Sequence, residues 1–235
     1  MDKKFRAARV WSNNELRKHA CNFFGSVVNV SAWQDSDKEG DHYKNYFSNA
    51  TSYVITNYGG KMGTSEDVNY EEYDLDLSVP LRNEFIQKFD IVFNHTTLEH
   101  VYENRLAFKN LCDMAKDAVI VVVPWLQEVH VVSGGFSDFW RYSPFAMEKL
   151  YEENGFDMVV CTYNNEKNVS VYLFCIGIRK EKIGKYPMYK KLSVENKLPA
   201  GCLVGQISII ERIQNKLRGV LNNLIVYVFS FALIL

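Results

Sequence analysis

The sequence has almost no net charge and no compositional bias that would mark an unusual class of protein. Its 235 residues include 27 Lys and Arg against 28 Asp and Glu, which gives a net charge of −1. A chain that is basic throughout is thereby excluded, and nucleic acid is not expected as a partner. Apolar residues make up 47% and charged residues 23%, which is ordinary for a globular domain and excludes disorder throughout.

Cysteines are few and follow no pattern. The five thiols contain no CxxC pair, and they are Cys21, Cys112, Cys161, Cys175 and Cys202. An odd, scattered set predicts reduced thiols and not a disulfide framework. The first residues, MDKKFRAARVWS, lack the apolar segment of a secretory signal. Together these absences predict a cytoplasmic protein.

Charge is unevenly placed along the chain. Residues 179–235 hold ten Lys and Arg but three Asp and Glu, while the rest of the chain holds 17 and 25. This asymmetry predicts an acidic body and a basic C-terminal part with a partner of its own. We expect a domain over residues 1–180, a basic linker over 181–206 and a C-terminal helix over 207–235.

The expected C-terminal helix begins amphipathic and ends apolar. Ile210, Ile213, Leu217 and Leu224 recur at helical spacing, and residues 224–235 are apolar except for one serine. Twelve helical residues span ~18 Å, which is too short for the ~30 Å hydrocarbon core of a bilayer. We expect this helix to attach the protein to an anionic membrane surface, at the inner face of the membrane. Packing on the domain, or on a second copy in a homodimer, is the alternative.

Strand-like and helix-like segments alternate through the remaining sequence. Helices are expected from Ser12, over 42–47, 103–115 and 145–153, and strands over 27–30, 53–56, 70–77, 89–93, 118–123, 158–162 and 169–178. The run 118–123 is continuously apolar up to Pro124, as in a parallel strand covered on both faces. The last two strands are joined by a short turn, so they should be antiparallel neighbours. The pattern predicts a doubly wound, mostly parallel seven-stranded α/β sheet with one antiparallel strand.

Two helix starts have clear signals. Ser12-Asn13-Asn14-Glu15 fits a capping box, which predicts that the first helix begins at Ser12. Ser143 followed by Pro144 supplies an N-cap and a proline at the first helical position.

Polar residues follow the expected strands, where ligands bind in open α/β sheets. They lie at 31–35, 57, 74–76, 94–100 and 125–130.

Here four features resemble class I S-adenosylmethionine-dependent methyltransferases, most closely the type 11 group. The features are FDIVFNHTTLEHV at 89–101, DLDLSVPL at 74–81, WRYSP at 140–144 and the reversed last strand. The resemblance covers residues 10–180. It implies a Rossmann-like methyltransferase fold, S-adenosylmethionine as cofactor, and in-line methyl transfer to a small-molecule, glycan or lipid-linked sugar acceptor. Some type 11 proteins associated with bacterial surface polysaccharides share a D-x-D-K-x-G-x-x-Y stretch, which residues 35–43 match.

The resemblance also implies roles for individual residues. The implied cofactor-binding residues are Ser31, Ala32, Asp35, Asn57, Asp76, Leu77, Asn94 and His95. The implied substrate-side residues are Trp125, Trp140, Arg141 and Tyr142. The last four have an alternative, which is a cluster that caps the end of the sheet.

Two histidines are the candidates for catalysis. An imidazole at His95 or His100 would suit a general base near neutral pH, and a structural hydrogen bond is the alternative for His100. They are five residues apart and cannot share a helix face as a zinc pair would, so no metal site is expected.

Two departures from the family pattern keep other functions open. The family's first loop is rich in glycine, but this chain has none between Gly25 and Gly40 and carries Trp33 there. The second strand ends at Asn57 instead of an acidic residue. A non-catalytic binding or scaffold protein with a degenerate cofactor loop is therefore the alternative. A different nucleotide-binding enzyme, such as a reductase, is disfavoured by the lack of GxGxxG after the first strand.

Overall fold

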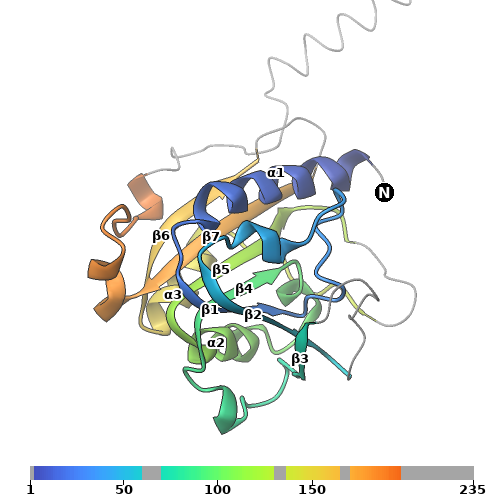
Figure 1. Ribbon diagram of the computed structural model, residues 1–235. Coiled ribbons are helices and arrows are strands. Elements are labelled where there is room, and N and C mark those ends of the chain that lie inside the picture. Colours follow the sequence, from blue (N-terminus) through green and yellow to red (C-terminus); the bar gives the residue numbers. More distant parts are fainter. Residues whose placement is uncertain (1–2, 60–69, 130–135, 165–169, 197–235) are drawn as a thin grey trace, which may run out of the picture.

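The centre of the molecule is a single twisted sheet (Figure 1). The structure, a computed structural model, describes residues 3–59, 70–129, 136–164 and 170–196. The expected C-terminal helix at 207–235, residues 197–206 of the expected linker and His130 lie outside these residues. Within the described ranges, no helix has both the length and the apolar character that crossing a bilayer requires.

Seven strands of the described chain build the sheet. They are β1 (Gly25–Val30), β2 (Ala50–Asn57), β3 (Glu71–Asp74), β4 (Phe89–His95), β5 (Ala115–Leu126), β6 (Phe156–Tyr163) and β7 (Val171–Arg179). Their order is β3-β2-β1-β4-β5-β7-β6, and β7 runs antiparallel to both of its neighbours. All other neighbours are parallel. The predicted doubly wound sheet with one antiparallel strand is confirmed.

Helices cover the two faces of the sheet unequally. The helix α1 (Lys3–Ala20) lies over one face, and α2 (Asn104–Met114) and α3 (Pro144–Glu153) lie over the other (Figure 1). Parallel neighbours are usually connected through an α-helix. Between β1 and β2, however, the chain forms only a short 3-10 helix, Tyr43–Tyr46. The loop that leaves β1 is therefore held by side-chain contacts and not by a helix.

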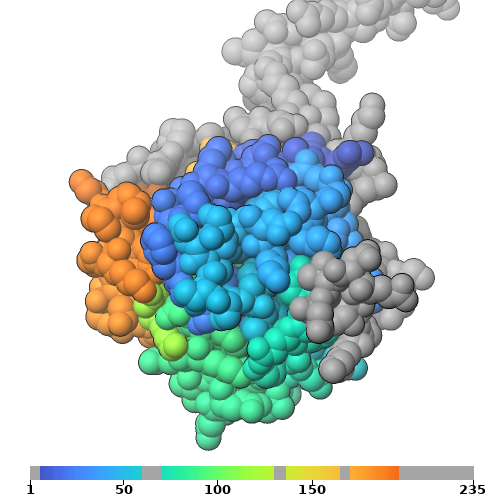
Figure 2. Space-filling view, viewed as in Figure 1, coloured from blue at the N-terminus to red at the C-terminus, as the bar shows by residue number. Residues whose placement is uncertain are grey.

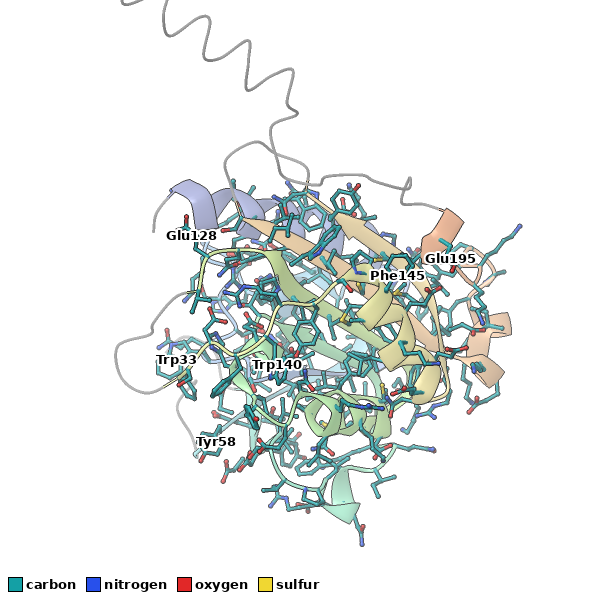
Figure 3. All side chains as sticks on the ribbon, turned by 180° about the vertical axis from the view of Figure 1, so that it is seen from behind. Trp33, Tyr58, Glu128, Trp140, Phe145 and Glu195 are labelled. Carbon is teal, nitrogen blue, oxygen red and sulfur yellow. The ribbon has the colours of Figure 1, made fainter. Side chains whose placement is uncertain are left out.

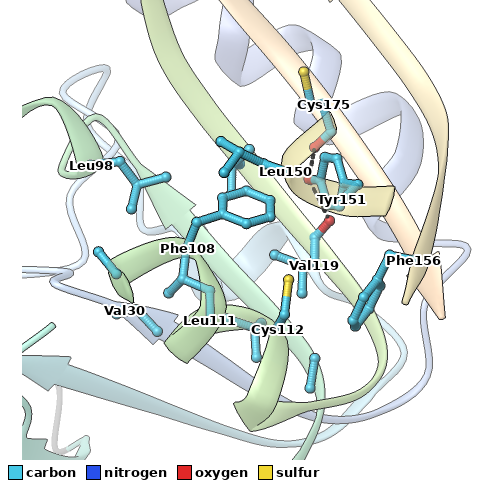
Figure 4. Close-up of a cluster of buried hydrophobic side chains, with 14 of the residues drawn as sticks. Val30, Leu98, Phe108, Leu111, Cys112, Val119, Leu150, Tyr151, Phe156 and Cys175 are labelled. Carbon is cyan, nitrogen blue, oxygen red and sulfur yellow. Dashed lines mark hydrogen bonds between the residues drawn. The ribbon is translucent and has the colours of Figure 1, made fainter. Parts of the chain in front are cut away.

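The face under α2 and α3 is packed mainly with aliphatic side chains (Figure 4). Tyr151 of α3 enters this core, and its hydroxyl donates to the carbonyls of Val119, at 3.0 Å, and Cys175, at 3.4 Å. Gly177 lies against the ring, where an added Cβ would come within 2.2 Å of a ring carbon. The pairing of Tyr151 with Gly177 thus ties α3 to β7.

The face under α1 is rich in aromatic and buried polar groups. Tyr43, Phe47 and Tyr53 pack there with Phe93 of β4. Buried polar groups accompany them, including Asn13, Asp35 and Asp37. Buried polar groups require hydrogen-bond partners, so this side of the molecule is organised by specific contacts.

The predicted start of the first helix and the predicted end of the fifth strand are wrong. The helix α1 begins at Lys3, and Ser12 is an interior residue whose hydroxyl donates to the carbonyl of Arg9 at 2.8 Å. The preceding Lys, Arg and Ala residues are good helix formers, so the helix continues upstream of the apparent capping box. Strand β5 passes through Pro124 to Leu126, with its register shift between these two residues. Proline is tolerated at such a bulge because no ladder donor is needed there.

The other helix signal is confirmed. The Ser143 hydroxyl accepts from the backbone N–H of Ala146 at 3.2 Å, with Pro144 as the first helical residue.

The first part of the expected linker packs on the domain. Tyr186 and Tyr189 lie against Phe23, with ring centroids 5.3 and 5.8 Å apart, and Leu192 and Val194 join the core under α3. This segment, orange in Figure 2, lies beside the blue N-terminal residues on the surface. Residues 180–196 are therefore an extension of the domain.

Candidate functional site

A cavity of about 450 Å³ opens at the carboxyl ends of the parallel strands. We call it the large cavity. Its walls come from residues that follow β1, β2, β3 and β4, and from Phe136 and Phe139. Trp33 and Tyr58 belong to it and lie on the same side of the molecule as Trp140, opposite Glu195 (Figure 3). Among the described residues that line it are Asp76 and Glu103 but no lysine or arginine.

The cavity sits where the order of the strands reverses. Strands β1 and β4 are neighbours, and Val30 is the register partner of Asn94. The side-chain amide of Asn94 donates to the carbonyl of Val30 at 2.8 Å. The segments after these two strands therefore lie side by side, which is the ligand position of open α/β sheets.

Asp76 and Leu77 form one wall of the large cavity. One oxygen of Asp76 accepts from the backbone N–H and the hydroxyl of Ser78, at 2.8 and 2.6 Å. Its other oxygen has no hydrogen-bond partner among the residues that the structure describes. The side-chain amide of Asn110 donates to the carbonyls of Leu77 and Val79, at 3.1 and 2.8 Å, and fixes this loop. The wall thus presents a fixed carboxylate oxygen beside an apolar surface.

Asn57 lines the cavity but is largely occupied by the loop after β1. Its Oδ1 accepts from the backbone N–H of Trp33 at 2.7 Å. Its Nδ2 donates to the carbonyl of Trp33 at 3.1 Å and to Glu72 at 2.8 Å. Both amide donors are used, and one lone pair of Oδ1 remains for a ligand. We call this arrangement the Asn57–Trp33 clamp.

The clamp explains how a loop without glycine adopts its shape. Ser31, Trp33, Asp35 and Lys38 all have a positive φ, between 53° and 65°. This region costs a residue with a side chain ~1 kcal/mol or more. The N–H of Trp33 donates to Asn57 of β2, and the N–H of Ser31 donates to the hydroxyl oxygen of Thr56 at 3.2 Å; these bonds offset part of that cost. Ser31 lines the large cavity, whereas Ala32 lines only a smaller neighbouring one.

Asp35 does not face a ligand, which corrects its expected role in cofactor binding. Its side chain is fully buried, and one oxygen accepts from Asn29 and Tyr53, at 2.7 and 2.6 Å. The other accepts from Tyr70 and from the N–H of Lys44, at 2.8 and 3.0 Å. The positive φ of Asp35 turns the carboxylate inward, so it fastens the loop to β1 and β2.

Asn94 is corrected in the same way. It is buried and lines neither cavity, because its side chain reaches back to β1. Its contribution is to hold the two strand ends together.

His95 is held between two residues of α1. A guanidinium N–H of Arg9 lies 2.9 Å from Nδ1, and the Ser12 hydroxyl lies 2.9 Å from Nε2. Because a guanidinium only donates, Nδ1 must accept, and Nε2 carries the proton. Burial, and then the charge of Arg9, lower the pKa of His95 well below its ordinary value. A general base at His95 is inconsistent with this geometry, since its lone pair is occupied.

His100 lines the large cavity and makes the structural bond that was its alternative role. Its Nδ1 hydrogen-bonds to the carbonyl of Ser137 at 2.9 Å. The contact ties the turn after β4 to the segment that carries Phe136 and Phe139. Across the described residues, no group of three or more His, Cys, Asp or Glu side chains could hold a metal ion.

Four residues expected on the substrate side cap the end of the sheet and do not line either cavity. Arg141 forms two contacts with Asp138, at 2.5 and 2.6 Å, and donates to the carbonyls of Gln127 and Glu128. With its guanidinium engaged in this way, Arg141 does not face the large cavity.

The aromatic members of this group are also engaged. The hydroxyl of buried Tyr142 donates to the carbonyl of Leu98 at 3.0 Å, and the indole of Trp140 donates to that of Tyr102 at 3.2 Å. Trp125 packs edge-on against Tyr163. The alternative, a capping cluster, agrees with these contacts.

Other aromatic residues form the cavity wall that sequence reasoning missed. They are Tyr58, Tyr102, Phe136 and Phe139. All four are exposed by about half or more of their surface. Tyr58 directly follows Asn57, so its position after β2 was the signal that could have identified it. Phe136 and Phe139 gave no comparable signal, because they lie in an irregular segment.

A second cavity, of about 180 Å³, adjoins the first, and we call it the small cavity. The two share Ser31, Trp33, Thr96 and Thr97. Arg9 and Lys38 line the small cavity, and no described Asp or Glu does. Sequence reasoning missed Arg9 because the first helix was expected to begin after it.

Glu99 is a buried acid near this region. It is 2% exposed, and Oε2 has no hydrogen-bond partner among the described residues. Burial raises its pKa to about 8, with Asp138 adding to the shift and Arg141 and Arg9 opposing it. Its carboxyl is therefore mostly protonated at neutral pH.

No protein-family model matches the chain, and no curated protein matches it. Solved structures do share its architecture. A methyltransferase dependent on S-adenosylmethionine from Mesorhizobium loti aligns with a TM-score of 0.53 at 11% identity, covering 74% of this chain and 99% of that one. One from Clostridium acetobutylicum gives 0.52 at 11% identity, covering 73% and 91%. Magnesium protoporphyrin IX methyltransferase from Synechocystis, with bound S-adenosylhomocysteine, gives 0.52 at 11% identity, covering 76% and 86%.

At sequence identities this low, structural similarity shows the fold of a protein but not its activity. Strand order, the antiparallel β7 and these similarities agree with the resemblance found in the sequence motifs. The chain has the Rossmann-like fold of class I S-adenosylmethionine-dependent methyltransferases.

Proposed function

We propose that this protein is an S-adenosylmethionine-dependent methyltransferase that binds its cofactor in the large cavity. The observation that carries the proposal is the wall formed by Asp76 and Leu77. It places a half-buried carboxylate oxygen beside an apolar surface, in a cavity of about 450 Å³ at the reversal between β1 and β4. This combination suits the adenine end of the cofactor, whose amino group donates and whose ring is apolar.

The remaining walls support the same assignment. Asn57 retains one acceptor lone pair for a ribose hydroxyl, although its donors are used within the protein. The cofactor supplies a methyl group on a positively charged sulfur, and the main task of the protein is to align the acceptor behind that methyl. Such a displacement requires no paired acid and base, which fits the occupied lone pair of His95.

The acceptor proposed is a small molecule, a glycan or a lipid-linked sugar, as in surface-polysaccharide modification. Tyr102, Phe136 and Phe139 provide rings on which a sugar or aromatic acceptor can stack. The acidic charge of the large cavity does not favour nucleic acid.

Titration with S-adenosylhomocysteine tests the cofactor. We expect calorimetry to give a Kd below about 100 µM, and NADH to show no binding under the same conditions. Binding of NADH in place of S-adenosylhomocysteine would contradict the proposal and favour a reductase.

A non-catalytic binding or scaffold protein is the second candidate. The Asn57–Trp33 clamp favours it, because the clamp occupies the position where the family usually has a free carboxylate. A folded protein that binds neither S-adenosylhomocysteine nor S-adenosylmethionine would support this candidate.

For the location we propose the cytoplasm, with attachment to the inner face of the membrane through residues 207–235. Full-length protein should bind anionic vesicles, and protein truncated after Lys197 should not. If truncation instead splits a homodimer or lowers the melting temperature, the segment has a structural role.

A further inference from the structure

The small cavity has an unusual balance of charge. Arg9 and Lys38 line it, and no described carboxylate does. Neither cation lies within 4.0 Å of a carboxylate oxygen among the described residues, whereas Arg17 and Lys18 of α1 pair with Asp37 and Glu15. The net charge that faces the small cavity is therefore positive.

Arg9 is held rigidly by groups that do not neutralise it. Its guanidinium donates to the hydroxyl of Tyr43 at 3.2 Å, to Nδ1 of His95 at 2.9 Å and to the hydroxyl of Thr96 at 3.2 Å. The Tyr43 hydroxyl in turn donates to Asn13 at 3.0 Å. A guanidinium has five N–H donors, so two remain without a partner among the described residues.

The carboxylic acid whose charge acts on Arg9 is Glu99, and it does not supply a counter-charge at neutral pH. Its effect on Arg9 is weaker than those of Tyr43 and Tyr172, and burial keeps the carboxyl mostly protonated. A partly buried cation without a counter-ion is costly to the folded state unless a ligand supplies one.

We propose that the small cavity is a subsite for a carboxylate or phosphate group, with Arg9 as its fixed cation and the exposed Lys38 as a second. This inference rests on the proposed function, because the subsite shares Ser31, Trp33, Thr96 and Thr97 with the proposed cofactor cavity. A cavity of about 180 Å³ is large enough for such a group. A planar guanidinium beside threonine hydroxyls matches the acceptor oxygens of both anions.

Two molecules could supply the anion. The first is the cofactor, whose amino-acid end carries a carboxylate and would be held by a side-chain cation where the loop has no glycine. The second is the acceptor, which would then carry a carboxylate or phosphate of its own.

Paired ligands separate these sources in the unmodified protein. S-adenosylhomocysteine and its decarboxylated analogue differ in the carboxylate alone, and calorimetry gives both affinities. If the cofactor supplies the anion, the analogue should bind about 10- to 50-fold more weakly. If the acceptor supplies it, the two should bind alike, and inorganic phosphate should bind to protein saturated with S-adenosylhomocysteine in a phosphorus NMR titration.

Variants then assign the subsite to Arg9. We expect Arg9→Met to abolish the affinity difference between S-adenosylhomocysteine and its decarboxylated analogue, or the binding of phosphate. Arg9→Lys should retain part of whichever effect the unmodified protein shows. The matched control is Arg105→Met, which removes a surface arginine that pairs with Glu153 at 2.7 Å and should change nothing. Lys38→Met removes an exposed side chain and should weaken the binding of the anion about 3-fold without affecting the fold. The Lys38→Met variant still tests the proposal if Arg9→Met does not fold.

The proposal is overturned if the unmodified protein binds S-adenosylhomocysteine and its decarboxylated analogue equally and also fails to bind phosphate. It is also overturned if folded Arg9→Met and Lys38→Met behave as the unmodified protein does. Failure of S-adenosylhomocysteine to bind at all would instead contradict the proposed function. In that case the phosphate titration alone decides: binding that requires Arg9 supports the subsite, and its absence excludes it.

Discussion

The two adjoining cavities share a wall but have opposite electrostatic character. The large cavity carries Asp76 and Glu103 and no described cation, whereas the small cavity carries Arg9 and Lys38 and no described carboxylate. A ligand that spans both would be oriented by this difference, with its donor-rich end towards Asp76 and its anionic end towards Arg9. Separate placement of the charges, more than their number, distinguishes the two ends of the site.

The two cavities also differ in how they are built. The large cavity rests on the aliphatic core under α2, with Leu75 and Leu77 belonging to both. The small cavity rests on hydrogen bonds around α1 and the loop after β1. There Asp37 accepts from Tyr46 at 2.6 Å and from the N–H of Glu39 at 2.7 Å. Apolar packing tolerates adjustment, but a buried polar network loses stability when one partner is removed.

The largest expected effect concerns Glu99, the buried acid whose charge acts on Arg9. The pKa of Glu99 is about 8 in the folded protein, against an ordinary value of 4.5. Between these values the folded state keeps a proton that the unfolded state has released, so stability falls as pH rises through this range. Glu99→Gln removes this dependence. Relative to the unmodified protein, it should gain about 3.5 kcal/mol of unfolding free energy between pH 5 and pH 8.

Urea unfolding at the two pH values measures this effect. Glu84→Gln, at an exposed residue paired with Arg82 at 3.2 Å, is the control and should show no such gain. If the unfolding free energies of Glu99→Gln and the unmodified protein differ by the same amount at both pH values, Glu99 is ionised in the folded protein. The small cavity would then have a counter-charge, and the contrast between the cavities would weaken.

The next effect is on the acidic cavity. Asp76→Ala removes the carboxylate oxygen that faces the large cavity. It should weaken the binding of S-adenosylhomocysteine about 30-fold, or about 2 kcal/mol. Stability should change little, because Asp76 is only half-buried and its hydrogen-bond partner Ser78 lies in the same turn. Calorimetry and thermal melting measure the two quantities, with Asp113→Ala on α2 as a control. An unchanged Kd would show that Asp76 does not contact the ligand.

A smaller effect is expected at the shared wall. Asn57→Asp introduces the acidic residue usual in the family, yet it removes both donors to Trp33 and Glu72 and places two carboxylates together. We expect a loss of about 1–2 kcal/mol in unfolding free energy and no gain in affinity for S-adenosylhomocysteine. Asn83→Asp, in the exposed turn before β4, is the control. Tighter binding without destabilisation would show that the clamp is dispensable.

The smallest expected effect is spectroscopic. Trp33 is the one tryptophan among the residues that line the described cavities. Ligand binding should change the intrinsic fluorescence, and Trp33→Phe should abolish that change while altering the affinity by less than about 1 kcal/mol. Trp140→Phe is the control, since that ring lines neither cavity. A response that persists in Trp33→Phe would place the ligand elsewhere.

Much of the fold and part of the site could be predicted from the sequence. The unbroken apolar run within β5 predicts a strand covered on both faces, and the short turn between β6 and β7 predicts their antiparallel pairing. Ser31, Asp76 and Leu77 line the large cavity because the ends of parallel strands must meet at one edge of the sheet. These features follow from local periodicity and from strand order.

Only the tertiary structure decided which way the polar side chains face. Asp35 and Asp76 both follow strands, yet a positive φ and four hydrogen-bond donors turn Asp35 inward, while Asp76 faces the cavity. Arg9 meets His95 across 86 residues of sequence. No local pattern encodes such a contact, because it depends on how α1 lies over the ends of β1 and β4. The sequence alone determined the type of the strands and their succession along the chain, since these follow from short-range periodicity. The separation of charge between the two cavities required the packed chain, because burial and distance exist only in three dimensions.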